Sequence, residues 1–191
     1  MNASLDIVVT IISWGVVAQH IWATRGHFVA DKMQLPAAVL AAIVLLTSIV
    51  YTVLIWTDEQ PLVAKLIGLL LEVAAMALFW WAIRASRQAQ LRFAFDLHQP
   101  RTLLQHGPYR YVRHPFYTSY IVFWTGWAMA TWSPVALLPL GAIIVLYILA
   151  ARGEERNFAA TAMSRDYEAY RSQAGLFWPR LFRPGAGKQR V

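Results

Sequence analysis

The chain has 191 residues, of which 58% are hydrophobic and 14% are charged. This ratio is too apolar for an ordinary soluble domain, and the absence of cysteine excludes thiol nucleophiles, cysteine zinc sites and disulfides. The net charge of +7 would suggest a nucleic-acid ligand in a soluble protein, but in a membrane protein it mostly reflects topology. We therefore predict an all-α integral membrane protein, a single domain over residues 1–191, with no nucleic-acid partner.

Five apolar stretches are long enough to predict transmembrane helices. They cover residues 5–23, 35–56, 62–83, 116–131 and 134–151. Only Trp132 and Ser133 lie between the last two stretches, so we expect them to form a helical hairpin. A soluble amphipathic helix is predicted to begin at Arg152 and to end at Gly175. The many tryptophans are interpreted as anchors in the two interfacial belts.

Lysine and arginine are distributed unequally among the loops. Sixteen of the seventeen lie in residues 24–34, in residues 84–115 or after Ala151, and only Lys65 lies elsewhere. Because positively charged loops are retained in the cytoplasm, this distribution predicts an external N-terminus and a cytoplasmic C-terminus.

The segment RTLLQHGPYRYVRHPFYTSY, residues 101–120, concentrates basic and aromatic residues before the fourth span. Interfacial anchoring would explain this composition, since Arg and Tyr both favour lipid headgroups. Pro115 at a helix start also leaves free N–H groups, which can hold an anion beside His114 and Arg113. Stabilisation of a helix start would by itself explain Glu154 and Glu155. The predicted hairpin, however, places Glu155 on the same side of the membrane as His114. We expect His114 and Glu155 on opposite walls of one ligand pocket.

These residues resemble the isoprenylcysteine carboxyl methyltransferases and their bacterial relatives. The resemblance rests on GPYRYVRHPFY at residues 107–117, on Glu154-Glu155-Arg156, on Tyr167 and Tyr170, and on Phe177-Trp178-Pro179. It implies a cofactor-binding half over residues 98–181, S-adenosylmethionine as methyl donor, and a lipophilic acceptor. It also implies that the protein is located in the bacterial inner membrane, in contact with membrane lipids.

Carried over by position, the family's cofactor contacts fall on Arg101, Thr102, Leu103, Leu104, Tyr109, His114, Pro115, Phe116, Tyr117 and Glu155. Family members often have a histidine where this chain has Arg101. Their substrate-contacting arginine aligns near Ala151, and this chain offers Arg152 one position later. Glu155 would bind the ammonium or ribose of the donor, and His114 its carboxylate.

The expected reaction is O-methylation of a carboxyl group on an isoprenoid-like or other hydrophobic molecule. In-line methyl transfer needs no nucleophilic residue of the protein, and a carboxylate is already ionised at neutral pH. The alternatives are a phospholipid amine N-methyltransferase, an NADPH-dependent membrane reductase, and a non-catalytic adaptor that binds anionic lipid. No metal site is expected, because histidines and carboxylates do not cluster as zinc ligands do. Glu72 fits a functional or a structural role equally, and Gln19 and His20 are placed at the interface.

Overall fold

The computed structural model describes residues 3–27, 35–86, 103–159 and 163–180. In these ranges the α-helices are α1 Ala3–His27, α2 Leu35–Thr57, α3 Leu62–Ser86, α4 Pro115–Thr131, α5 Leu137–Ala159 and α6 Ser164–Gln173. Two short 3₁₀ helices, η1 Gly107–Arg110 and η2 Pro134–Ala136, precede α4 and α5. The described part of the chain contains no strand beyond an isolated bridge between Val112 and Gly175. The all-α prediction is confirmed.

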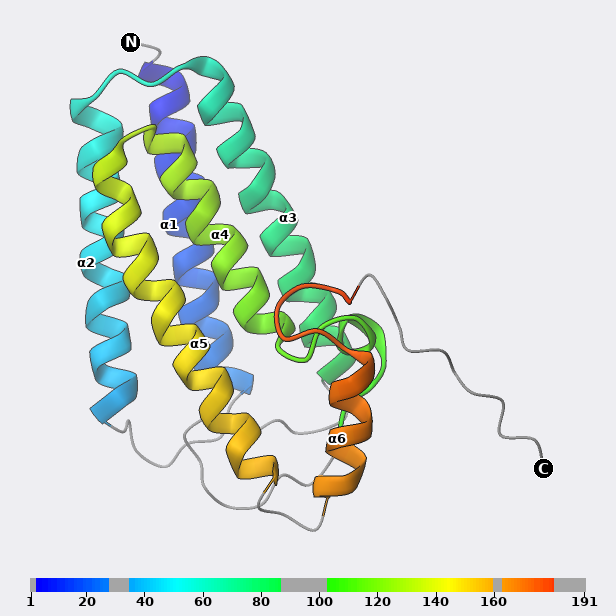
Figure 1. Cartoon of the computed structure of the whole chain (residues 1–191). Helices are drawn as coiled ribbons and strands as arrows, with labels where there is room; N and C mark the ends of the chain where they lie inside the picture. The colour runs from blue at the N-terminus through cyan, green and yellow to red at the C-terminus, as the bar shows by residue number, and fades with distance from the viewer. Residues whose placement is uncertain (1–2, 28–34, 87–102, 160–162, 181–191) are drawn as a thin grey trace.

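The helices α1 to α5 run side by side, and the short α6 lies beside one end of this bundle (Figure 1). Among the described residues, α1, α2, α3 and the α5 segment are long and apolar enough to cross a membrane. At 17 residues, α4 is shorter, about 25 Å at 1.5 Å per residue, which is near the lower limit for a span. The protein is thus an integral membrane protein, and a fifth crossing by α4 remains a prediction.

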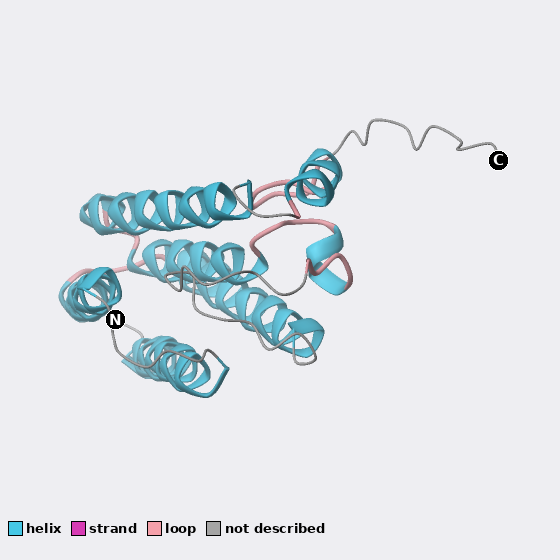
Figure 2. Cartoon of the chain, turned by 90° about the horizontal axis from the view of Figure 1, so that it is seen from below, coloured by secondary structure: helices cyan, strands magenta, loops and turns pink. Residues whose placement is uncertain are grey.

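One end of the bundle carries most of the described charged residues. It comprises residues 107–115, residues 152–156 and residues 163–180, and we call it the charged end. Seen from this side, the loop before α4 and the segment after α6 lie next to each other (Figure 2). The chain segments that the sequence singles out therefore meet at one place.

Helices α1 and α3 run parallel and pair through a seven-residue repeat. The contacts are Asp6 with Lys65, Ser13 with Glu72, and His20 with Phe79. Each pair is separated by the same number of residues, because a seven-residue spacing keeps the same faces of two helices in contact. Both members of the Asp6–Lys65 ion pair are buried, so the one basic residue outside the predicted cytoplasmic loops is neutralised locally.

Small residues bring α3 and α4 close together. A Cβ atom added to Gly126 would lie 2.8 Å from the Gly68 carbonyl oxygen and 2.9 Å from Leu71 Cβ. Glycine at this crossing lets the two backbones touch, as in many membrane helix pairs. The contact holds α4 in the centre of the bundle, and α4 carries the candidate site at its first residues.

Two of the tryptophans are core residues, which corrects their interpretation as interfacial anchors. Trp124 and Trp127 are buried in α4, with their rings stacked at 5.7 Å. They pack against Tyr51, whose hydroxyl donates a hydrogen bond to the Ala136 carbonyl, 2.8 Å away. These three rings form part of the core around α4.

The boundary between the last two helices also differs from the prediction. The sequence predicts an amphipathic helix from Arg152, but α5 continues through Ala159 and a separate helix begins at Ser164. Gly153, the one weak helix former at the expected break, costs only about 1 kcal/mol inside a helix. Glu154 and Glu155 therefore lie in the last turns of α5, not at a helix start.

Candidate functional site

The loop before α4 pairs with the segment after α6. The Arg113 and His114 N–H groups donate to the carbonyls of Gly175 and Leu176, at 2.8 and 3.2 Å, and the Gly175 N–H donates to Tyr111. Gly175 is required here, since a Cβ atom would lie 1.7 Å from the Trp178 carbonyl oxygen. These bonds join two motifs that lie about sixty positions apart.

Arg113 links three parts of the charged end. Its Nε donates to Glu155 Oε1 at 2.7 Å, and its Nη1 donates to the carbonyls of Arg171 and Ala174. The side chains of Arg113 and Glu155 are only 7% and 13% exposed. A buried charge needs such pairing, so the loop before α4, the end of α5 and α6 depend on one another.

His114 lies between two carboxylates. Its Nδ1 is 3.5 Å from Glu154 Oε2, and its Nε2 is 3.4 Å from Glu155 Oε1, without hydrogen-bond alignment at Nε2. Burial lowers the pKa of His114, but the polar contacts and negative charges of Glu154 and Glu155 outweigh burial and raise it. The sequence predicts His114 and Glu155 on opposite walls of a pocket. The structure instead brings them into direct contact, because Arg113 draws Glu155 toward the loop.

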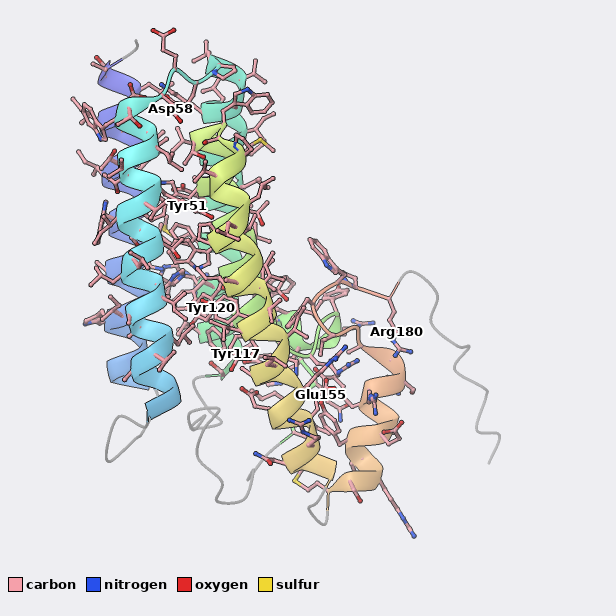
Figure 3. The ribbon with its side chains drawn as sticks, turned by 60° about the vertical axis from the view of Figure 1, so that its left-hand side comes forward. Tyr51, Asp58, Tyr117, Tyr120, Glu155 and Arg180 are labelled. Atoms are coloured by element: carbon pink, nitrogen blue, oxygen red, sulfur yellow. The ribbon has the colours of Figure 1, made fainter. Side chains whose placement is uncertain are left out.

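Aromatic side chains continue the site into the bundle. The Tyr117 hydroxyl donates to Glu154 Oε1 at 2.6 Å, and the Tyr117 ring stacks on His114 and on Tyr147, with centroid distances of 5.7 and 5.5 Å. Figure 3 shows Tyr117 near the charged end, between Glu155 and the deeper Tyr120. A ligand at the charged end therefore has aromatic rings on its membrane side.

The remaining predicted cofactor contacts are distributed around this centre. Tyr109 is buried, its carbonyl accepts from the Tyr170 hydroxyl at 2.7 Å, and its own hydroxyl has no partner among the described residues. Pro115 is the first residue of α4, and Phe116 packs on Phe79 with ring centroids 5.5 Å apart. The structure therefore places this group of residues around the start of α4.

The two leucines lie further out. Leu103 packs against Tyr167 and Tyr170, and Leu104 is half-buried. Arg101 and Thr102 lie outside the described residues.

Arg152, the predicted substrate contact, is exposed on the last turns of α5. With Glu155, Tyr167 and Arg171 it lines an open depression of about 220 Å³ between α5 and α6. This is smaller than the roughly 300–1,000 Å³ typical of small-molecule sites, so a larger ligand would extend beyond it.

Two features of the site are not predicted from the sequence. One is the ion pair of Arg113 with Glu155, and the other is the bond of Tyr117 to Glu154. The available signal was charge complementarity between two segments on one predicted membrane face. The pairing of Gly175 with the loop had no sequence signal of its own, because backbone bonds leave no pattern in side chains.

Charges of both signs thus stand side by side at the charged end, next to aromatic rings. Such a cluster suits a zwitterionic ligand, whose carboxylate and ammonium can be paired at the same time. Among the described residues there is no group of three His, Asp or Glu side chains that could hold a metal ion.

A family model described as phospholipid methyltransferase matches residues 63–166, more than half of the chain. The chain belongs to the phospholipid methyltransferase family. The match begins in α3 and extends into α6, so it includes His114, Glu154 and Glu155. No curated protein and no solved structure matches the chain. As a member of this family, it is a membrane methyltransferase that acts on lipid-like substrates.

Proposed function

We propose that this phospholipid methyltransferase family member uses S-adenosylmethionine to methylate a carboxylate on a lipophilic acceptor. The observation that carries the proposal is the cluster of Arg113, His114, Glu154 and Glu155. The methyl donor has an ammonium group, a carboxylate and a sulfonium, and this cluster offers a counter-charge for each. Membership of a methyltransferase family speaks against the reductase and adaptor alternatives.

The fit of the donor to this chain rests on one buried atom and on the start of α4. His114 Nε2 is buried and has no hydrogen-bond partner among the described residues, so a ligand oxygen would satisfy it. The free N–H groups in the first turn of α4 add to the positive potential there. Arg113 and His114 would thus hold the donor carboxylate, with Glu154 and Glu155 toward its ammonium or ribose.

Bound S-adenosylmethionine would supply an electrophilic methyl group, which passes to the acceptor oxygen while the electron pair of the broken C–S bond remains on sulfur. Because a carboxylate carries no proton at neutral pH, the protein needs no general base for this step. Its residues hold the two reactants in contact and exclude water. The aromatic side chains on the membrane side of the charged end, Tyr117 and Tyr147 among them, would line the place of the positive sulfonium.

Donor affinity of two single variants tests the proposal. Glu155→Gln removes a charged contact while it keeps the shape, so we expect a roughly ten- to hundredfold weaker affinity by calorimetry. His114→Ala should weaken the same binding. Glu59→Gln is the matched control, since Glu59 is exposed in the turn between α2 and α3, at the other end of the bundle. Unchanged affinity in both site variants, each eluting as folded protein, would refute the donor site.

The acceptor is identified by mass spectrometry of lipid extracts incubated with enzyme and isotope-labelled donor. Label on an ester-forming carboxyl group is the expected result. Label on a phospholipid amine would assign the alternative chemistry, which requires the amine to lose a proton first.

We also propose that the charged end faces the cytoplasm, where the donor is dissolved. The support is the distribution of lysine and arginine among the loops. Because the chain has no cysteine, single cysteines can be introduced at Ser4 and at Lys188 without background labelling. An impermeant thiol reagent should label the first from outside intact cells and the second only after lysis. Labelling of both from one side would contradict the topology.

A further inference from the structure

Two neighbouring polar residues of α1 lie inside the bundle, where the sequence predicts interfacial positions. Gln19 Oε1 accepts a hydrogen bond from Trp80 Nε1, 3.2 Å away. The His20 ring packs against the rings of Phe79 and Tyr120, each with a centroid distance of 4.7 Å. Both residues therefore face other helices of the bundle.

Each of these residues has a buried nitrogen atom without a partner. Gln19 Nε2 and His20 Nε2 have no hydrogen-bond partner among the described residues. Buried polar atoms are nearly always paired in proteins, so two adjacent exceptions call for an explanation. The amide orientation of Gln19 follows from chemistry: the Trp80 indole N–H can only donate, so it must face the oxygen. The unpaired atom of Gln19 is therefore an NH₂ donor.

The two residues lie close to the proposed donor site. Tyr120 contacts His20 on one side and Tyr117 on the other, with the Tyr117 centroid 6.3 Å away. Tyr117 in turn stacks on His114. One aromatic residue thus separates His20 from the side chains around the donor site. Tyr120 lies five residues after Pro115 in α4, about 7.5 Å along the helix axis, and Figure 3 shows it deeper in the bundle than Tyr117.

The pair lies close to the side of the bundle. Gln19, His20 and Trp80 are half-buried, whereas Phe79 and Phe123 beneath them are fully buried. At this depth in a membrane, the surface around α1 and α3 faces lipid. An acceptor with an apolar tail in the bilayer could therefore bring its polar head to Gln19 and His20.

We propose that Gln19 and His20 form the subsite that holds the head of the acceptor, and that this head is a carboxylate. This inference rests on the proposed function, since it places the acceptor relative to the methyl donor. The Gln19 NH₂ group offers only donors, and the Nε2–H tautomer of His20 offers another. Both suit the two oxygens of a carboxylate, whereas an ammonium head has only donors and would leave Gln19 Nε2 unpaired.

Binding of two amphiphiles of equal chain length tests the subsite without methyl transfer. The probes are radiolabelled hexadecanoate and hexadecylamine, measured on detergent-purified full-length protein. Gln19→Glu replaces the donor NH₂ by an acceptor oxygen at nearly constant shape. We expect hexadecanoate to bind at least tenfold more weakly to this variant and hexadecylamine to bind more tightly. His20→Phe should weaken hexadecanoate binding without a gain for hexadecylamine.

Gln173→Glu is the control for added negative charge, because Gln173 is exposed at the end of α6. A wild-type preference for hexadecylamine, or equal effects of Gln19→Glu and Gln173→Glu on hexadecanoate binding, would overturn the subsite.

Two further measurements separate this inference from the proposed function. Donor affinity should be the same in Gln19→Glu and in the wild type, because the Gln19 side chain bonds to Trp80 and, among the described residues, makes no hydrogen bond to the charged end. If the wild type fails to bind S-adenosylmethionine, the proposed function fails, but the probe preference still decides the subsite. If the wild type methylates a carboxylate and Gln19→Glu does so with unchanged KM, the function stands and the subsite is wrong.

Discussion

Replacing Arg113 by methionine should detach the segment after α6 from the bundle. The substitution removes the ion pair with Glu155 and the bonds to the carbonyls of Arg171 and Ala174. Loss of one partner of a buried ion pair costs about 3–5 kcal/mol, because the other charge stays buried without compensation. Glu155 is slightly exposed, so we take the lower value, about 3 kcal/mol.

Hydrogen exchange measures this local opening directly. The Gly175 N–H is protected by its bond to the Tyr111 carbonyl. A loss of about 3 kcal/mol corresponds to an exchange rate at Gly175 that is roughly a hundredfold faster. Peptides from α1 to α3 should exchange as in the wild type.

Arg110→Met is the matched control, because Arg110 is exposed in the same loop. Equal exchange at Gly175 in Arg113→Met and Arg110→Met would show that the buried guanidinium does not hold the segment.

Two further predictions concern the helix crossing and the titration of the site. Gly126→Leu should lower the free energy of unfolding by about 2 kcal/mol, because its side chain forces α3 and α4 apart. The thermal midpoint should fall by roughly 4–8 °C, whereas Gly141→Leu, at an open position in α5, should not lower it. Glu154→Gln should lower the pKa of His114, as measured by NMR, because one of the two carboxylates that raise it is neutralised. Since the folded pKa is raised, His114 stabilises the fold fully at acid pH and less as pH rises through that pKa. An unchanged pKa in the variant would contradict the assignment.

The membrane fold follows from the sequence because its signal is local. Each span is a continuous apolar stretch, and a backbone in lipid can satisfy its hydrogen bonds only within a helix or a closed barrel. The helices α1, α2 and α3 accordingly begin and end close to the predicted limits. The limit between α5 and α6 is less well predicted, since tertiary contacts of Glu154 and Glu155 extend α5 past a glycine.

The residues of the candidate site also follow from the sequence, because the charged and aromatic side chains that form it are contained in recognisable motifs. His114, Tyr117 and Glu155 are predicted together, and the structure brings them to one end of the bundle. Whether they bind the methyl donor stays a prediction until the variants are measured.

Only the tertiary structure decides how these side chains are paired. Arg113 forms an ion pair with Glu155, and the Tyr117 hydroxyl donates a hydrogen bond to Glu154. Gln19 and His20 face the inside of the bundle. In sequence, a polar residue at a span end looks the same whether it faces lipid headgroups or another helix. Its partner is chosen by the register of helices far apart in the chain, such as the seven-residue repeat that aligns α1 with α3. The sequence thus determines which groups are present, and helix packing determines which of them remain free to meet a ligand.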